Sequence, residues 1–382
     1  MKIGIEAQRI FRKKKHGMDI VALNIIKALQ EIDTVNEYYI FTNSQEDPDC
    51  LSETSNFKII RTPGYLYPIW EQIVLPKLVS KYKLDLLHCT SNTAPINIDV
   101  PLFLTLHDII YMEMNPLKQI GGLYQKWGNF YRSKIVPIIV KKASKIITVS
   151  NFERKRIVDY FSTNESMIET LYNGVSEHFF KKANSVQINT AKYKYHLPDN
   201  YIFLLGNTDP KKNIPRTLKA FELYYDNAEN PLPLVIADYS LEMLMKEVDN
   251  KNIKPETVEN IHLIGYVSNT DLPVVYQISS LFLYPSVRES FGIPILEAMA
   301  SRVPVITSNT SAMPEVAGNA AVLINPFDYE DIAQKIDSVL SNNQTSLHYI
   351  IKGLSRVEQF KWKNSGLKLL SIYKKLFQDK FI

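Results

Sequence analysis

Apolar runs of strand length alternate with amphipathic runs along this chain, and the pattern starts afresh near the middle. Such an alternation predicts a parallel sheet with helices on both faces. In the first half we expect strands at 2–6, 38–42, 58–61, 85–88, 102–106 and 145–149, with helices at 19–31 and 70–82. In the second half we expect strands at 201–205, 232–237, 261–263, 281–284, 303–307 and 321–324, with a helix at 214–225. The fold class is therefore α/β, with two Rossmann-like, doubly wound domains.

The boundary between the two halves is expected within 176–200, a polar stretch that follows the turn signal Asn173-Gly174. We place the first domain at 1–183 and the second at 184–362. Residues 363–382 include an amphipathic run that cannot bury its apolar face alone. The length of 382 residues also favours two domains over one.

The composition is that of a soluble globular protein, with 45% apolar residues, 22% charged residues and a net charge of +4. No run approaches the length of a membrane-spanning helix. The first residues include Glu6 and Arg9, where a signal peptide needs an unbroken apolar core. The two cysteines, Cys50 and Cys89, fall in no motif, so we expect reduced thiols and a cytoplasmic location.

The most informative segment is PSVRESFGIPILEAMA at 285–300, which directly follows an expected strand. Its glycine, Gly292, lets the backbone approach a ligand and opens a helix, in which Pro294 is tolerated in the first turn. The free amides at a helix start bind anions. Glu289 and Glu297 flank this start, where one carboxylate can meet a sugar and the other a ribose diol. Acidic residues near the positive end of a helix also stabilise a helix without any ligand.

The two glutamates around FGIPILEAMA resemble the signature of the family 4 retaining glycosyltransferases, which have the GT-B fold. Further segments match family patterns in the same order, namely TLHDII (105–110), ITVSNFERKRI (147–157), LYNGV (171–175), GNTDPKKNIPRTLKAF (206–221), LIGYVSNTDLPVVYQIS (263–279) and residues 306–333. The resemblance covers nearly the whole chain. It implies two Rossmann-like domains facing a cleft, with the last helix crossing back to the first domain.

The resemblance implies a nucleoside diphosphate sugar as donor, GDP- or UDP-linked, with no cofactor and no metal. Lys212 would pair with the diphosphate, Glu289 with sugar hydroxyls and Glu297 with the ribose. The other donor-binding residues that it implies are Gly17, Lys211, Gly265, Tyr266, Val267, Ser290, Phe291, Gly292 and Ile293. Two adjacent loop lysines are also typical of a solvated surface.

One position departs from the family pattern. Some members carry an arginine directly after a strand-ending glycine, as a second phosphate contact, and this chain has Asn207 there. Arg288 is a candidate for the missing contact, although it equally fits a surface ion pair. We keep Asn207 and Arg288 among the donor-binding candidates.

His107 follows an expected strand in the first half, and the resemblance places it over the reacting sugar. We count it as a catalytic candidate together with Glu289 and Lys212. The pair His107-Asp108 also fits a capped helix start, with Asp108 as the cap. No carboxylate can be assigned as a nucleophile, and the turn Asp47-Pro48-Asp49 is not expected to bind a metal.

Two basic features remain. The loop 9–17, RIFRKKKHG, is either a solvated loop or a contact for an anionic acceptor such as a lipid diphosphate. Residues 114–152 contain no acidic residue and mix basic with aromatic side chains: Lys118, Lys126, Arg132, Lys134, Lys141, Lys142 and Lys145 with Tyr124, Trp127, Phe130 and Tyr131. This mixture fits an anionic membrane surface, or a packed helix with lysines in water. Nucleic acid is not expected as a partner, because no binding module accompanies the charge.

The resemblance implies retaining transfer of a hexose to a hydroxyl of a saccharide. We expect a lipid-linked acceptor and a role in surface polysaccharide or glycoconjugate synthesis. IWEQIVLPKL at 69–78 resembles a segment of mannosyl- and rhamnosyl-transferring members. Two alternatives are a UDP-sugar epimerase and a non-catalytic sugar-nucleotide-binding protein. An epimerase needs several acid–base groups in the first domain, where the chain offers chiefly His107. A non-catalytic protein is expected to lack Glu289, Glu297 or Lys212, and all are present.

Overall fold

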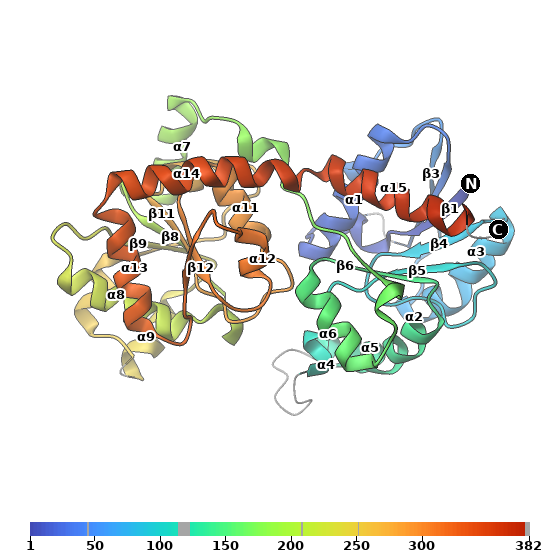
Figure 1. Cartoon of the computed structure of the whole chain (residues 1–382), viewed down its shortest axis with the longest axis horizontal. Coiled ribbons are helices and arrows are strands. Elements are labelled where there is room, and N and C mark those ends of the chain that lie inside the picture. The colour runs from blue at the N-terminus through green and yellow to red at the C-terminus, as the bar shows by residue number, and fades with distance from the viewer. Residues whose placement is uncertain (44–45, 114–122, 208, 251, 379–382) are drawn as a thin grey trace. The chain divides into compact units, whose positions relative to one another are not determined.

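A computed structural model describes residues 1–43, 46–113, 123–207, 209–250 and 252–378. The chain forms two compact units (Figure 1), the first comprising Met1–Gly174 with Trp362–Ile382 and the second Val175–Lys361. The division thus falls at Gly174 and not at 183, because the chain joins the second unit directly after that glycine. There the Val175 N–H donates to the Phe360 carbonyl at 2.8 Å.

The described part of the first unit contains a seven-stranded parallel sheet in the order β3-β2-β1-β4-β5-β6-β7. Its strands are β1 Lys2–Glu6, β2 Glu37–Thr42, β3 Phe57–Arg61, β4 Leu86–Cys89, β5 Leu102–Thr105, β6 Lys145–Thr148 and β7 Ile168–Thr170. The order reverses between β1 and β4, which makes their carboxyl ends the topological switch point of this sheet.

Helices of the first unit cover both faces of this sheet. They are α1 Gly17–Ile32, α2 Tyr67–Ile69, the π-helical turn η3 Trp70–Val74, α3 Leu75–Tyr82, α4 Ile110–Glu113, α5 Leu123–Lys142, α6 Asn151–Phe161 and α15 Trp362–Gln378. The described ranges of this unit also contain the short 3-10 helices Gln8–Phe11, Pro48–Cys50 and Glu165–Met167. The C-terminal helix α15 packs along α1 (Figure 1) so closely that a Cβ on Gly366 would lie 3.0 Å from Ala28.

The described part of the second unit repeats the plan with a six-stranded parallel sheet in the order β10-β9-β8-β11-β12-β13. Its strands are β8 Ile202–Leu205, β9 Leu234–Ala237, β10 Ile261–Gly265, β11 Leu281–Tyr284, β12 Val305–Ser308 and β13 Val322–Ile324. The order reverses between β8 and β11. This second switch point is the place where a doubly wound sheet binds its ligand.

The helices of the second unit follow its strands in turn. They are α7 Ser185–Tyr195, α8 Ile214–Asn227, α9 Leu241–Asp249, α10 Leu272–Ile278, α11 Ile293–Ala300, α12 Met313–Ala317, α13 Tyr329–Leu340 and α14 Asn343–Val357. Among the residues described here, 3-10 helices also form at Glu177–Phe180, Pro210–Lys212, Pro255–Asn260 and Glu358–Phe360.

Each sheet is buried on both faces, as the near-continuous apolar strands predict. Every residue of β5, β9 and β11 is buried, and in each unit apolar side chains of strands and helices pack together in a hydrophobic core cluster. The prediction of two Rossmann-like α/β sheets is therefore confirmed. In the described ranges, no helix combines the length and the apolar character needed to cross a membrane.

Candidate functional site

The loops that follow β8 and β11 meet at the switch point of the second unit. The strands lie side by side, with Leu204 paired to Leu283. The Val287 N–H donates to the carbonyl of Lys211 at 2.8 Å, which joins the two loops. Asn213 adds a side-chain bond from Nδ2 to the Pro285 carbonyl at 3.2 Å. The backbone therefore fixes the lysine loop against the loop that carries Arg288 and Glu289.

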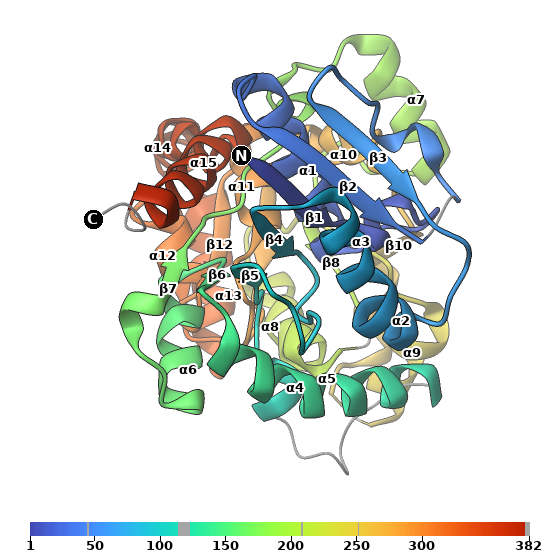
Figure 2. The same cartoon turned by 90° about the vertical axis from the view of Figure 1, so that its right-hand side faces the viewer.

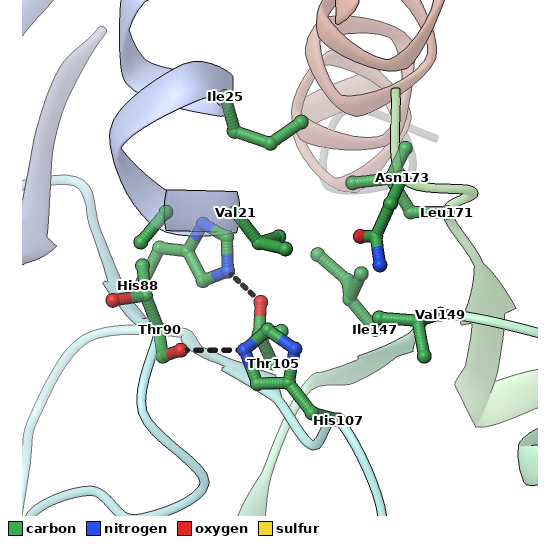
Figure 3. Close-up of a pocket in the computed structure, with 11 residues that line it drawn as sticks. Val21, Ile25, His88, Thr90, Thr105, His107, Ile147, Val149, Leu171 and Asn173 are labelled. Atoms are coloured by element: carbon green, nitrogen blue, oxygen red, sulfur yellow. Dashed lines mark hydrogen bonds between the residues drawn. The ribbon is translucent and has the colours of Figure 1, made fainter. Parts of the chain in front are cut away.

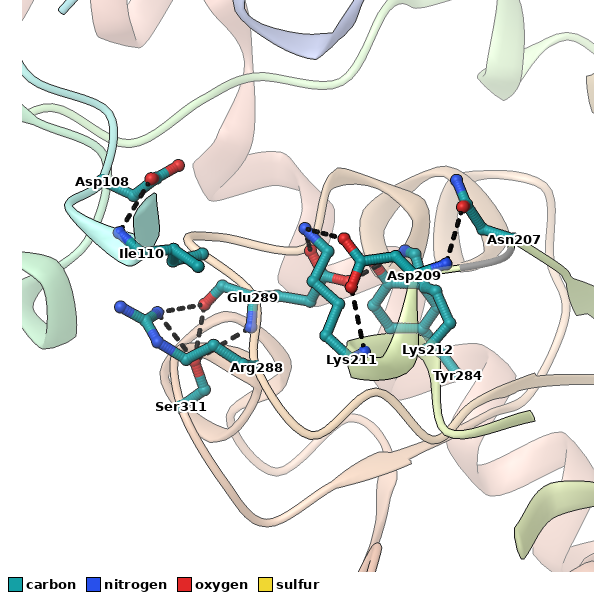
Figure 4. Close-up of polar contacts among 10 residues, drawn as sticks. All are labelled: Asp108, Ile110, Asn207, Asp209, Lys211, Lys212, Tyr284, Arg288, Glu289 and Ser311. Atoms are coloured by element: carbon teal, nitrogen blue, oxygen red, sulfur yellow. Dashed lines mark hydrogen bonds and ion pairs between the residues drawn. The ribbon is translucent and has the colours of Figure 1, made fainter. Parts of the chain in front are cut away.

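A lysine–glutamate pair occupies this junction (Figure 4). The Lys212 Nζ lies 2.8 Å from Glu289 Oε1 and 3.1 Å from the Tyr284 hydroxyl, and it stands over the Tyr284 ring at 4.7 Å. Lys211 Nζ lies 4.0 Å from the other carboxylate oxygen. Two ammonium groups thus face the Glu289 carboxylate, and Lys211 Nζ also lies 3.8 Å from Asp209 Oδ2. Ammonium groups held side by side in this way are suited to a phosphate ligand.

The ionisation of Glu289 follows from these neighbours. Burial alone would raise the pKa of Glu289, but the ammonium groups of Lys212 and Lys211 and a hydrogen bond from Tyr284 hold it below its usual value. Glu289 is therefore a carboxylate at neutral pH. In that state it can only accept hydrogen bonds, as a partner of sugar hydroxyls must.

The backbone of Glu289 is held by Ser311, a residue that the sequence did not single out. The Ser311 hydroxyl donates to the Glu289 carbonyl at 2.6 Å and lies 3.1 Å from its N–H (Figure 4). Arg288 Nη1 lies 3.3 Å from the same hydroxyl and 3.3 Å from the same carbonyl. The guanidinium of Arg288 is thus committed to this loop. Tyr284 also escaped prediction, although a hydroxyl-bearing residue ending a buried strand is a usable signal.

The start of α11 has the geometry expected of an anion site. Gly292 precedes the helix with φ of 107°, a backbone conformation that only glycine adopts readily. Pro294 lies in the first turn, where its missing N–H costs nothing. The segment from Ser290 to Ile293 leads into this helix start, whose backbone amides are suited to bind an anion beside Glu289.

Glu297 lies further along α11 in an environment opposite to that of Glu289. The Tyr276 hydroxyl, from α10, lies 3.4 Å from its Oε2. Burial raises the pKa of Glu297 to about 7, and the hydrogen bond from Tyr276 only partly opposes this shift. The two glutamates of the motif therefore differ in protonation near neutral pH, one ionised and the other close to its midpoint.

The remaining second-unit candidates lie on other loops. Gly265 ends the edge strand β10 with φ of 63°, Tyr266 is 75% exposed and Val267 is buried. Asn207 uses its side-chain oxygen to accept the Asp209 N–H at 3.0 Å, which shapes the lysine loop. The structure thus brings together the four charged candidates Lys211, Lys212, Arg288 and Glu289, with residues 290–292 beside them. Residues 265–267 lie at the end of the edge strand β10.

His107 follows β5 in the first unit and is buried (Figure 3). The backbone N–H of His107 donates to Asn92 Oδ1 at 2.7 Å. Its ring nitrogen Nε2 lies 3.0 Å from the Thr90 carbonyl oxygen. Because a carbonyl only accepts, Nε2 carries the proton. Burial lowers the pKa of His107, so the ring is neutral at pH 7. The ring lines a small cavity of about 20 Å³, which Asn173 also lines.

Asp108 acts as the helix cap that the sequence offered as an alternative. Its Oδ1 accepts the N–H of Ile110, the first residue of α4, at 3.2 Å. The cap explains Asp108 without a ligand. His107 contacts a different loop, through Thr90 and Asn92. The capping role of Asp108 therefore does not account for His107.

Gly17 is the first residue of α1, and a Cβ built there meets no atom within 4 Å. The packing of the first unit therefore does not require a glycine at this position. In the preceding loop, Arg9 pairs with Asp19 at 2.8 Å and Lys15 pairs with Asp47. The described residues contain no group of three or more His, Cys, Asp or Glu side chains placed to hold a metal ion.

Comparison with known proteins agrees with this architecture. Residues 16–179 match the model of Glycosyltransferase Family 4, and residues 187–356 match that of Glycosyl transferases group 1. O-antigen chain mannosyltransferase B of Escherichia coli is 31% identical over 64% of this chain and 64% of its own length. The serotype-specific mannosyltransferase WbdA of the same species is 25% identical over 72% of this chain, which spans only 33% of that protein.

A solved structure matches nearly the whole chain. Anabaena Alr3699/HepE, solved in complex with UDP and glucose, superposes with a TM-score of 0.72 at 14% identity. The match covers 98% of this chain and 100% of that one. This likeness shows the fold. The chain belongs to the glycosyltransferases of family 4 and group 1, and its two Rossmann-like units are those of the GT-B fold.

Proposed function

We propose that this protein transfers a glycosyl group from a nucleoside diphosphate sugar to a hydroxyl of a saccharide acceptor. The observation that carries the proposal is the cluster of Lys211, Lys212 and Glu289 at the switch point of the second sheet, beside the start of α11. Membership of the family supports the class of reaction. The mannosyltransferase names of the first relatives favour a mannosyl donor.

The donor diphosphate would lie against Lys212 and the backbone amides at 290–293. Negative charge builds on the diphosphate as the bond to the sugar breaks, and fixed cations and amides stabilise that charge without reorganising. Lys212 is suited to this role because its neighbours already hold its ammonium in place. We propose that these groups suffice without a metal ion.

Glu289 would orient the donor sugar by accepting hydrogen bonds from its hydroxyls, and Glu297 would accept from the ribose. The neutral ring of His107 would lie near the reacting sugar. We propose transfer of a hexose with retention of configuration, in which the acceptor hydroxyl attacks from the face that the diphosphate leaves. The departing phosphate would take the proton of the attacking hydroxyl, so no separate carboxylate nucleophile is required.

We propose that the acceptor is lipid-linked and that the first unit contacts an anionic membrane. On α5, Trp127 and Phe130 are 71% and 57% exposed, with their rings 6.2 Å apart, and Lys134 Nζ stands 5.7 Å from the Phe130 ring. Tyr131 instead packs inward. Residues 114–122, with Lys118, lie outside the described residues, as do the side chains of Tyr124 and Lys126.

A second apolar surface lies beside α5. The exposed side chains of Leu66, Ile69 and Ile73 line α2 and η3. Figure 2 shows α2 next to one end of α5, and the rings of Tyr67 and Tyr131 lie 6.2 Å apart across that junction. The only acidic residue in 65–83 is Glu71, which is fully buried. Apolar residues without exposed carboxylates suit an anionic lipid surface.

Nucleotide release tests the reaction. The protein is incubated with UDP- and GDP-hexoses, alone and with saccharide acceptors, and free nucleoside diphosphate is measured. Glu289→Ala should reduce release strongly. Glu242→Ala is the matched control, since that exposed carboxylate pairs with Lys246 at 2.8 Å in the same unit and lies on α9.

Three outcomes contradict the proposal. Absence of release with every donor tested argues against transfer. Equal release by the Glu289 and Glu242 variants removes the cluster from the site. Conversion of the sugar while it stays attached to the nucleotide points to an epimerase.

A further inference from the structure

Glu71 is a fully buried carboxylate at the centre of a polar cluster in the first unit. It lies in the π-helical turn η3 and accepts hydrogen bonds from the Tyr67 hydroxyl at 2.6 Å and the Thr93 hydroxyl at 2.5 Å. Gln72 Nε2 donates to it at 3.0 Å, and the Tyr131 hydroxyl of α5 also donates to it. Burial raises the pKa of Glu71, and these donors oppose that shift only in part.

The Thr93 bond attaches Glu71 to the loop at 90–94, which follows β4. Gln72 holds the same loop, because its Nε2 also donates to the Ala94 carbonyl at 3.1 Å. The other end of the loop is tied to β1, where the Thr90 hydroxyl donates to the Glu6 carbonyl at 2.7 Å. The loop is thus fixed at both ends by residues buried at the switch point of the first sheet.

This loop is the support of His107. The Asn92 side chain accepts the His107 N–H, and the Thr90 carbonyl accepts from its ring. Asn92 has φ of 68°, a left-handed conformation that asparagine tolerates and most residues avoid. Thr93 follows Asn92 directly in the same loop. The hydrogen bond from the Thr93 hydroxyl to Glu71 therefore restrains both the Asn92 side chain and the Thr90 carbonyl, which orient His107.

We propose that Glu71 is a positioning residue for His107, acting through Thr93 and the loop at 90–94. The inference rests on the proposed function, because it assigns His107 a place in the site. Stability alone does not explain a buried carboxylate, since apolar residues of similar shape are often at least as stabilising. The carboxylate instead fixes geometry. It accepts hydrogen bonds from hydroxyls of α2, of α5 and of the loop at 90–94 at the same time, and so holds these three segments in place relative to one another.

The sharpest variant is Thr93→Val, which keeps the shape of the side chain and removes the two hydrogen bonds of its hydroxyl, one to Glu71 and one to the Tyr67 hydroxyl, its partner in the same cluster. Glu71→Gln is the second variant, because an amide nitrogen cannot accept from the hydroxyls around it. Asp33→Asn is the matched control. Asp33 is also a buried carboxylate of the first unit and accepts from the Tyr38 hydroxyl at 2.6 Å, and its partners lie outside the loop.

Three readouts are combined: thermal unfolding, the 15N resonances of the His107 ring, assigned with His107→Gln, and donor turnover split into kcat and KM. We expect Thr93→Val and Glu71→Gln to shift the His107 resonances. Both should lower kcat, by up to about 100-fold, with a smaller change in donor KM. Asp33→Asn should lower the unfolding temperature and leave the resonances and kcat unchanged.

Unchanged His107 resonances in folded Thr93→Val protein would overturn the positioning role, whatever the activity. Shifted resonances with an unchanged kcat would equally overturn it, because His107 would then move without consequence. If no donor is turned over by the wild type, the proposed function fails, and the resonances alone still decide whether Glu71 orients His107.

Discussion

At the scale of single residues, Glu289 in the loop before α11 and Glu297 on α11 show how different neighbours give two glutamates different charge states. Glu289 faces two lysines and is held ionised, whereas Glu297 is buried beside a tyrosine and has a raised pKa. Sequence alone placed both near a helix start. It did not distinguish their charge states, because Tyr276, Tyr284 and Lys212 reach them from other segments.

The raised pKa of Glu297 predicts a specific dependence of stability on pH. In the folded chain its pKa is about 7, against an ordinary value of 4.5. Between these values the folded state keeps a proton that the unfolded state has released, so the free energy of unfolding falls as pH rises through this window. Glu297→Gln removes that penalty. We expect the variant to gain roughly 1–3 kcal/mol over the wild type at pH 8 and almost nothing at pH 4.5.

Denaturant unfolding at the two pH values measures this difference. Glu297→Gln should also bind nucleoside diphosphates more weakly, because the amide keeps one acceptor in place of two. An equal stability difference at both pH values would show that Glu297 titrates normally.

For Gly17 we predict a substitution that keeps the stability of the protein but lowers its turnover. Nothing in the first unit lies within 4 Å of a Cβ built there, so Gly17→Ala should leave the protein as stable as before or up to about 1 kcal/mol more stable. If donor phosphates approach this backbone, the same methyl group should reduce turnover. Gly64→Ala is the control, because Gly64 has equally open surroundings. Full turnover by the Gly17 variant would remove that glycine from the site.

At the scale of elements, strands were predicted better than their connections. Twelve of the strands in the described ranges could be expected from apolar runs, and their observed ends differ from the expected ones by a few residues at most. The strand Ile168–Thr170 was not expected, because three residues carry too little pattern. The expected helix at 70–82 begins with the π-helical turn Trp70–Val74, since its 3.6-residue periodicity does not reveal a wider turn.

Residues of the candidate site that share one local motif could be predicted from the sequence. Residues that join the site through contacts between distant segments could not. Glu289 and Gly292 were found because they share a local motif. Ser311, which holds the Glu289 backbone, and Glu71, which holds Thr93, depend on contacts between residues far apart in sequence. A single sequence contains no signal for such pairs.

The exposed surfaces of α2 and α5 predict salt-sensitive membrane binding. We expect wild-type protein to sediment with anionic vesicles at low salt and to be released at high salt, because each basic residue near the surface contributes about 1 kcal/mol. Replacing Trp127 and Phe130 with Ala should abolish sedimentation. Val186→Ser, which changes an apolar side chain 70% exposed on α7, should have no effect. Equal behaviour with neutral and anionic vesicles would contradict the hypothesis.

At the scale of the whole molecule, the groups proposed to hold the diphosphate all belong to one unit. Lys211, Lys212 and the start of α11 lie within Val175–Lys361, in loops held together by bonds such as that from Val287 to Lys211. Donor binding should therefore be a property of the second unit. In the proposed reaction, His107 and Gly17 of the first unit would act on the sugar and on the reaction more than on the affinity for nucleotide.

Nucleotide binding tests this division of labour. UDP or GDP should stabilise the protein by about 2.7 kcal/mol at 100 times the dissociation constant. The stabilisation should be equal with magnesium and with a chelator, if lysines and helix amides carry the charge of the diphosphate. Amide hydrogen exchange should slow mainly at 206–213 and 285–297, because those backbones meet the ligand. Lys212→Met should lose most of this protection, and Lys246→Met, at an exposed pair on α9, should retain it. Protection confined to the first unit, or found only with magnesium, would contradict the assignment of the diphosphate to these loops.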